Sequence, residues 1–358
     1  MSDGAPMPGA ALPSAMPRFQ KAFAMTHASE ISAARRHGQH LADQAGMGPT
    51  QAGKLAIAIT EAGTNILKHA ADGWLVISAA RHNDCHGVEV LALDRGAGIA
   101  NISQSLRDGV STSGTAGTGL GAMRRLSDTF DLYSTPTLGT AVYLFIGAAS
   151  SPAILLEGER EAPLQRLQVG GVCLPIAGEE ECGDDWYVQQ DSHGATMLVV
   201  DGLGHGPGAA VAAQAAVAEL RLNAGKAPQE MMQSLHTALA PTRGAAAAVA
   251  QLTFDQDSLT FVGVGNIFTS VIDGEHSQHL MSHNGIVGHN LRKVQAMSTG
   301  WPVGACCIFC SDGINTQWDL KRYPGLLACH PMLIAGVLYR DFRRVRDDAT
   351  ALVIKRVN

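Results

Sequence analysis

The sequence predicts two consecutive α+β domains. Its 358 residues exceed the ~250–300 residues at which single hydrophobic cores usually stop growing, so two domains with separate cores are expected. Helical and strand-like apolar patterns alternate in both halves of the chain. Between them, residues 148–163 combine Ala148–Pro152 with the charged run Glu157–Glu161, which is typical of a linker. We therefore expect a disordered, proline-containing tail at 1–17, a first domain at 18–147, a linker at 148–163 and a second domain at 164–358.

Composition excludes several classes of protein. Hydrophobic residues make up 46% and charged residues 16% of the chain, as in ordinary globular proteins. The net charge of −6 gives no electrostatic footprint for nucleic acid. No apolar stretch approaches the ~20 residues that span a bilayer, and the first residues lack the basic end of a signal peptide. We expect a cytoplasmic protein without a membrane or nucleic-acid partner.

Apolar periodicity locates the main elements of each domain. In the first domain, Leu55, Ile59 and Ile66 recur at helical spacing, and residues 87–93 and 140–146 are typical of strands. In the second domain, strands are expected at 167–174, 196–200, 260–264, 306–310 and 350–354, with an alanine-rich helix at 208–222. The strand at 306–310 holds Cys306, Cys307 and Cys310, which we interpret as reduced core thiols rather than metal ligands.

Polar residues follow one face of the helix in the first domain. Glu61, Asn65 and His69 are spaced i, i+4 and i+8, away from the Leu55/Ile59/Ile66 stripe. An amide oxygen is a suitable ligand for Mg²⁺, and a carboxylate one turn away can act as a general base. A merely solvated helix face is the alternative interpretation.

Two glycine motifs follow this helix. Asp94 ends an apolar strand and is followed by Gly96 and Gly98, so its carboxylate is presented at a turn that a flat ring can approach and can accept a hydrogen bond from an amine such as that of adenine. Further on, the Gly117–Gly121 segment leads into an expected helix, where backbone amides suit a polyphosphate. Its spacing matches neither the dinucleotide-binding fingerprint nor the P-loop.

In this order, the motifs resemble the ATPase domain of anti-sigma-factor serine kinases of the RsbT-like group, which has the histidine-kinase/gyrase-type ATPase fold. The resemblance covers about residues 30–146 and includes Asp108–Gly114 and Gly139–Thr140. It implies that Asn65 binds Mg²⁺, Glu61 activates an acceptor serine and Asp94 holds adenine, supported by Thr140. It also implies that Gly96 and Gly98 shape the adenine pocket. The loop that closes over the phosphates of ATP would contain Gly117, Gly119, Leu120 and Gly121.

A sensor histidine kinase would share this ATP site. Such a protein needs a phosphoacceptor histidine on a dimerisation helix ahead of the ATPase domain. Only about 40 residues that we expect to be ordered precede Glu61, and His37 and His40 have no adjacent acidic residue. We interpret both histidines as surface residues of a helix.

Aspartates recur at strand ends in the second domain. Asp201 and Asp312 follow apolar strands and each precedes a glycine, Asp184 precedes the segment 186–188, and Asp347 precedes the last strand. A turn or strand cap is the common role of an Asp-Gly pair. Carboxylates gathered at one sheet edge would instead repel one another unless cations neutralised them, and Mg²⁺ or Mn²⁺ prefers such oxygen ligands. Two such ions can generate a hydroxide and clamp a phosphoryl group.

This second set resembles the SpoIIE-like branch of metal-dependent type 2C protein phosphatases, particularly the RsbX-like members, over about residues 166–356. The resemblance implies an αββα sandwich in which Asp184, Asp201 and the Gly202 carbonyl bind metal, with Asp312 and Asp347 at the second ion. Asp185 and Asp348 remain adjacent alternatives to Asp184 and Asp347. The offset of His205 from Asp201 differs from that of the histidine in eukaryotic relatives, so His205 is not assigned to catalysis.

Together the two resemblances imply a signalling enzyme that phosphorylates and dephosphorylates a serine or threonine of a partner. By resemblance the partner is a STAS-domain anti-sigma-factor antagonist or stressosome-type protein, with a downstream signalling enzyme or sigma factor as a further partner. Because both activities together would only consume ATP, regulation between the domains is expected, through the 148–163 linker or the helix after Gly206. The alternative is an active phosphatase whose ATP-binding domain only senses nucleotide or sequesters a partner.

Overall fold

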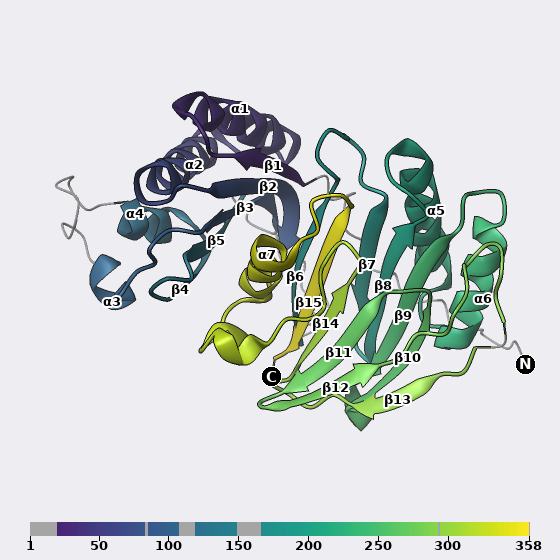
Figure 1. Cartoon of the computed structure of the whole chain (residues 1–358). Coiled ribbons are helices and arrows are strands. Elements are labelled where there is room, and N and C mark those ends of the chain that lie inside the picture. The colour runs from purple at the N-terminus through teal and green to yellow at the C-terminus, as the bar shows by residue number, and fades with distance from the viewer. Residues whose placement is uncertain (1–19, 83–84, 107–118, 149–165, 293, 358) are drawn as a thin grey trace, which may run out of the picture.

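The computed structural model describes residues 20–82, 85–106, 119–148, 166–292 and 294–357. The expected tail at 1–17 and nearly all of the expected linker lie outside these residues. Within the described part of the chain, no helix is both long and apolar enough to cross a membrane. Helices α1 and α2 lie at one end of the layered structure and α5 and α6 at the other, and helix α7 lies between the sheet of the first domain and the sheets of the second (Figure 1).

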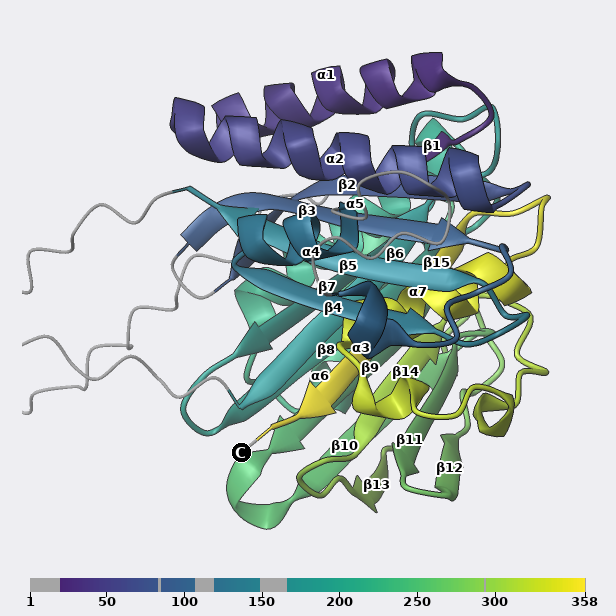
Figure 2. The same cartoon turned by 90° about the vertical axis from the view of Figure 1, so that its left-hand side faces the viewer.

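The first domain is one antiparallel sheet with two long helices on one face. The strand order is β1-β2-β3-β5-β4. Figure 2 shows α1 and α2 side by side over the sheet, and their apolar side chains form a core with one face of the sheet. The elements are β1 (Lys21–Ala24), α1 (Ala28–Gln44), α2 (Pro49–His69), β2 (Gly73–His82), β3 (Cys85–Asp94), α3 (Ile102–Ser105), α4 (Gly119–Leu126), β4 (Thr129–Ser134) and β5 (Thr140–Gly147).

The second domain is a sandwich of two antiparallel sheets, ordered β13-β10-β9-β8-β7 and β12-β11-β14-β15-β6. A shared core fills the space between the sheets, α5 and α6 cover the first sheet, and α7 covers the second. The predicted αββα architecture is confirmed. Its elements are β6 (Leu167–Leu174), β7 (Asp184–Gln190), β8 (Gly194–Gly202), α5 (Pro207–Asn223), α6 (Pro228–Leu239), β9 (Ala245–Thr253), β10 (Ser258–Val264), β11 (Phe268–Asp273), β12 (His276–Leu280), β13 (Met297–Gly300), β14 (Cys306–Cys310), α7 (Pro331–Phe342) and β15 (Ala349–Arg356).

The strands and helices expected from periodicity are all present. The cysteine strand is β14, in which every residue is buried, and burial raises the pKa of its thiols. Those cysteines are therefore core residues, as predicted. His37 is half-buried on α1 and its ring packs against Phe23, whereas His40 is exposed, so only His40 has the expected surface position.

Helix α7 corrects the expectation of two separate cores. Its residues 331–340 are all buried. One continuous cluster joins α7 and β14–β15 of the second domain to Trp74, Leu93 and Tyr143 of the first. The face of the first sheet that α1 and α2 leave open is therefore covered by a helix of the second domain. The Gln20 side chain adds a further link: its Nε2 donates to Gly171 O of β6 and its Oε1 accepts from Cys173 N, both at 2.7 Å.

Candidate active sites

Helix α2 presents the polar face that the sequence predicts. Leu55, Ile59 and Ile66 are buried, whereas Glu61 and Asn65 are only half-buried. The start of α4 lies against this polar face: a Cβ on Gly119 would lie 2.9 Å from Glu61 Oε2 and 3.4 Å from Asn65 Nδ2. Only glycine allows this approach without displacing those side chains. The N-terminal amides of α4 are thus brought beside Glu61 and Asn65, an arrangement suited to an anion with its Mg²⁺.

The other members of the glycine segment divide into two groups. Leu120 is half-buried and Gly121 is buried on α4. Gly117 and the stretch Asp108–Gly114 lie outside the described residues.

Asp94 ends β3 with its side chain fixed by backbone donors. Asp94 Oδ1 accepts hydrogen bonds from Gly96 N at 2.7 Å and Thr140 N at 3.2 Å. Thr140 is also the β5 residue directly opposite Asp94 in the sheet. Burial raises the pKa of Asp94, and these two backbone donors oppose that increase. With Oδ1 held, Oδ2 has no hydrogen bond to any residue that the structure describes and is available to an exocyclic amine, so the site fits adenine.

Two glycines are required for the turn after Asp94. A Cβ on Gly96 would lie 2.5 Å from His69 O, the end of α2. Gly98 has φ +74° and passes so close to Thr135 that a Cβ would lie 2.0 Å from its carbonyl oxygen. These contacts join the turn to α2 and to the β4–β5 connection. The structure therefore brings Glu61, Asn65, Asp94, Gly119 and Thr140 around the end of α2.

Four aspartates of the second domain converge on one edge of the sandwich, which we call the carboxylate edge (Asp184, Asp201, Asp312 and Asp347). Asp184 on β7 pairs directly with Asp201 on β8. The buried Asp184 Oδ2 accepts a hydrogen bond from Ser311 Oγ at 2.6 Å, which ties it to the residue before Asp312. Two chain segments from one sheet and two from the other thus meet at this edge.

The electrostatics of the carboxylate edge favour a cation. Burial raises the pKa of Asp201, and the neighbouring charges of Asp184, Asp312 and Asp347 raise it further. Burial likewise raises the pKa of Asp184 and of Asp347. Carboxylates that resist ionisation for this reason become stable anions when a divalent cation replaces the missing positive charge.

Nowhere in the described ranges do three or more acidic, histidine or cysteine side chains come close enough to hold one ion by themselves. Mg²⁺ usually keeps several waters and takes only one or two carboxylates. Gly202 is buried beside Gly183, to whose carbonyl oxygen its N–H donates at 2.9 Å.

Hydrogen bonding distinguishes the adjacent aspartates. Both carboxylate oxygens of the buried Asp348 accept backbone bonds, from Ile176 N and Gly183 N at 2.7 Å each. Asp347 uses Oδ1 for Asp348 N and is half-exposed at the carboxylate edge. Asp185 follows Asp184 on a strand, so the two side chains lie on opposite faces. This geometry favours Asp184 and Asp347 as the cation-facing members of each pair.

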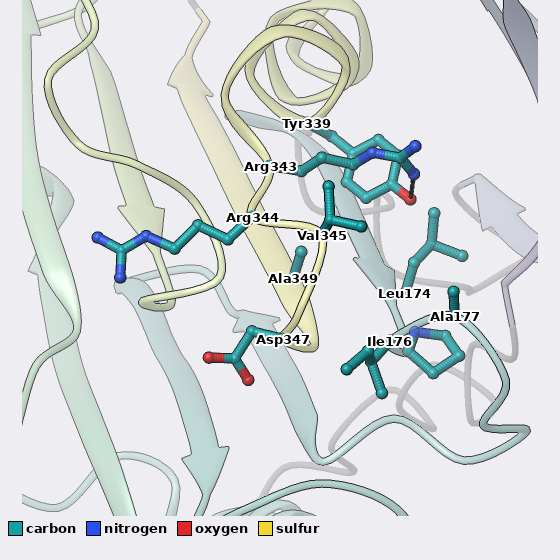
Figure 3. Close-up of a pocket in the computed structure, with 10 residues that line it drawn as sticks. Leu174, Ile176, Ala177, Tyr339, Arg343, Arg344, Val345, Asp347 and Ala349 are labelled. Carbon is teal, nitrogen blue, oxygen red and sulfur yellow. Dashed lines mark hydrogen bonds between the residues drawn. The ribbon is translucent and has the colours of Figure 1, made fainter.

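A small pocket of about 60 Å³ lies beside Asp347, between the end of α7 and the end of β6. Figure 3 shows Arg344 and Asp347 extending to the same side of the loop, away from Tyr339 and Arg343. Arg343 Nη1 donates to Tyr339 Oη at 2.7 Å on that other side. The pocket has room for no more than a few water molecules.

Sequence reasoning missed two supporting residues. Asn266 Nδ2 donates to Asp312 Oδ2 at 2.7 Å, and Ser311 holds Asp184. Ser311 directly precedes Asp312, and Asn266 follows Gly265 at the end of β10, but neither position signals a long-range partner in sequence. His205 Nδ1 lies 3.1 Å from Glu179 Oε1 on the surface.

Comparison with known proteins agrees with this geometry. Residues 24–146 match the family model described as histidine kinase-like ATPase domain, and residues 191–357 match that of stage II sporulation protein E (SpoIIE). The serine/threonine-protein kinase RsbT of Bacillus subtilis (strain 168) is 35% identical over 113 residues, which are 32% of this chain and 85% of RsbT.

The second half has its own relatives. The phosphoserine phosphatase RsbX of Bacillus subtilis (strain 168) is 26% identical over 148 residues, 41% of this chain and 73% of RsbX. A crystal structure of RsbX in complex with magnesium is 21% identical with a TM-score of 0.48, covering 55% of this chain and 98% of that one. The chain belongs to the histidine kinase-like ATPase family of RsbT through its first domain, to which a SpoIIE-type type 2C phosphatase domain is joined.

Proposed function

We propose that the chain transfers phosphate from ATP to a serine or threonine of a partner protein and also hydrolyses that phosphoester. The observation that carries the hydrolase half is the convergence of Asp184, Asp312 and Asp347 on Asp201, whose pKa they raise. The contact of Gly119 with Glu61 and Asn65 supports the transferase half. The kinship with RsbT and RsbX is compatible with both halves.

In the transferase half, each residue has a role that its position supports. Asp94 Oδ2 accepts the adenine amine while Oδ1 stays fixed by Gly96 N and Thr140 N. Asn65 would hold Mg²⁺, which neutralises the phosphates of ATP. Glu61 accepts the proton of the attacking hydroxyl as the bond between γ-phosphorus and the bridging oxygen breaks, so phosphoserine and ADP leave.

In the hydrolase half, Asp184, Asp201, Asp312 and Asp347 would hold Mg²⁺ or Mn²⁺, together with the Gly202 carbonyl. Bound divalent ions lower the pKa of water and neutralise a phosphoryl group. The carboxylates would orient the attacking water, and Ser311 and Asn266 keep Asp184 and Asp312 in place. The phosphorus–oxygen bond breaks, water supplies the new oxygen, and serine and inorganic phosphate are released.

The proposed partner is a STAS-domain anti-sigma-factor antagonist or a stressosome-type protein, since RsbT and RsbX are the relatives of the two halves. The first experiment incubates the purified Asp201→Asn variant with γ-labelled Mg-ATP and extract of the source cells, beside the wild type. A small labelled protein should persist with the variant and fade with wild type plus Mn²⁺. Hydrolysis of p-nitrophenyl phosphate by wild type, but not by Asp201→Asn, checks the phosphatase separately.

The second candidate is a phosphatase whose first domain senses nucleotide or sequesters a partner without transfer. The shared core around α7 favours this alternative, because nucleotide binding to the first domain could change the packing of the second domain through that core. Binding of ATP without labelling of any protein, in either the wild type or Asp201→Asn, would support this candidate and contradict kinase activity.

A further inference from the structure

The last turn of α7 meets the turn that follows β3. Arg340 is a fully buried cation at this contact. Its Nη1 donates to Asp94 O at 2.9 Å, while Nε and Nη2 donate to Asp341 at 2.9 and 2.7 Å. Burying a guanidinium is costly unless its donors are satisfied, so this contact fixes the relative position of α7 and Asp94.

The carbonyl that Arg340 binds belongs to the residue expected to hold adenine. On the other side of Asp94, Gly139 packs so closely that a Cβ would lie 2.1 Å from the same carbonyl oxygen. The side chain is held through Oδ1 by Gly96 N and Thr140 N. The backbone of Asp94 is therefore held by the second domain and its carboxylate by the first, which together set the direction of Oδ2.

A charged network extends this contact to both sides of Asp94. Arg95 Nη2 donates to Arg340 O, and Arg95 Nε lies 3.6 Å from Asp341 Oδ1. Arg343, the residue after the end of α7, stacks on the ring of Trp74 at 4.4 Å. Trp74 lies on β2 opposite Leu93, the residue before Asp94. Arg340 and Asp341 thus meet the turn of Asp94 and Arg95, whereas Arg343 packs on the neighbouring strand β2.

We propose that Arg340, from the phosphatase domain, is a positioning residue for the nucleotide-binding carboxylate of Asp94, so that both domains build the ATP site. The proposal rests on the role proposed above for Asp94. Removal of the Arg340 guanidinium frees the Asp94 carbonyl, lets the turn relax and misdirects Oδ2. Because the hydrogen bond lost has a charged donor, we expect ADP affinity to fall by about tenfold or more.

The test measures binding of Mg-ADP to the full chain by calorimetry. Arg340→Met should bind ADP at least about tenfold more weakly, and Arg340→Lys, which keeps one cationic donor, should recover part of that loss. Arg343→Met is the matched control: it removes another interface arginine that does not bond Asp94, and it should bind ADP within about twofold of wild type. Equal losses in Arg340→Met and Arg343→Met, or no loss in a folded Arg340→Met, would overturn the proposal.

Two further measurements separate this proposal from the function on which it rests. If the wild type binds ADP no better than Asp94→Asn, the proposed nucleotide site itself fails. If Asp94→Asn loses binding and Arg340→Met does not, only the positioning role fails. Hydrogen exchange in the wild type needs no variant: Mg-ADP should slow the amides of Tyr339–Arg343 but not those of α5, and an unchanged α7 contradicts the proposal.

Discussion

Helices α2 and α7 lie on opposite faces of the same sheet, but they serve it differently. Helix α2 buries one stripe and leaves Glu61 and Asn65 half-buried for chemistry. Helix α7 has no free face along 331–340, because a second sheet lies on its other side. The helix that carries the proposed catalytic residues therefore packs within one domain, whereas the helix on the other face of its sheet packs against both domains.

The largest expected effect isolates the chemistry of α2. Glu61→Gln keeps the size of the side chain beside Gly119 but removes the general base, so phosphotransfer should fall by about 10²–10⁴-fold. ADP binding and p-nitrophenyl phosphate hydrolysis should stay near wild type. Labelling assays with the partner protein measure the first effect and calorimetry the second. Retention of full transfer would remove Glu61 from catalysis.

Cavities made in the two helices should affect different activities of the protein. Leu333→Ala on α7 and Leu55→Ala on α2 each remove a fully buried side chain and should cost about 2–5 kcal/mol of unfolding free energy. Since Leu333 lies in the core that both domains share, its loss should weaken both ADP binding and phosphatase activity. Leu55→Ala should weaken ADP binding and spare phosphatase activity at temperatures where the protein stays folded. If both variants kept full phosphatase activity, the result would contradict a shared core.

The loop that follows α7 holds two adjacent aspartates for which we expect different roles: Asp348 is structural and Asp347 faces a cation. Asp348→Asn places an amide against two backbone donors and should lower the unfolding free energy by about 1–3 kcal/mol. Asp347→Asn relieves repulsion from Asp312 and should leave metal-free stability unchanged or higher while weakening Mn²⁺ binding. Denaturant melts with and without Mn²⁺ compare the two variants. If Asp348→Asn weakened Mn²⁺ binding and Asp347→Asn lowered the unfolding free energy, the two roles would have to be assigned the other way round.

The smallest expected effect concerns pH at the start of α7. His330 stacks on Tyr143 of the first domain at 4.4 Å and caps α7 through Met332 N. Burial, with repulsion from His82, lowers the pKa of His330 to about 4, below the usual ~6.5 of the unfolded chain. The unfolded state therefore binds the extra proton between these values, and stability is complete above pH ~6.5 and declines as pH falls toward 4.

At pH 5 this decline amounts to about 1–2 kcal/mol. His330→Asn keeps a capping acceptor without titrating in this range. Between pH 7 and pH 5 the variant should therefore lose about 1–2 kcal/mol less unfolding free energy than the wild type. Denaturant melts at the two pH values measure the difference. An identical pH dependence in His330→Asn and wild type would exclude His330 as its source.

The sequence predicts elements well where an apolar stripe or a short apolar run marks them. The stripe on α2 and the apolar strands β3, β5, β8 and β14 are visible as periodicity or as continuous apolar runs. Helix α7 is not visible in the same way, because a helix buried all round has no amphipathic period. The shared core could not be predicted for the same reason, and the expected routes of regulation, the 148–163 linker and the helix after Gly206, did not include α7. Helix α5 packs within the second domain's own core.

Site residues divide in a similar way. Asp94, Asp201 and Asp312 are marked in sequence by the apolar strands before them and the glycines after them, and the structure places them at or near the ends of β3, β8 and β14. The choice between Asp347 and Asp348 depends on bonds from Ile176 and Gly183, which only the folded chain brings near. Arg340 has no local signal, because its partner Asp94 is 246 positions away.

The most direct test of the link through α7 is the affinity of the chain for Mn²⁺ with and without saturating ADP. Helix α7 contacts Asp94 through Arg340, and Arg344 N beyond it donates to Gly313 O, beside Asp312, at 2.7 Å. We predict that ADP changes Mn²⁺ affinity at the carboxylate edge by about fivefold or more, and that Mn²⁺ changes ADP affinity by the same factor. Asp94→Asn and Arg340→Met should abolish the change. Identical Mn²⁺ affinities with and without ADP in the wild type would contradict coupling of the two sites.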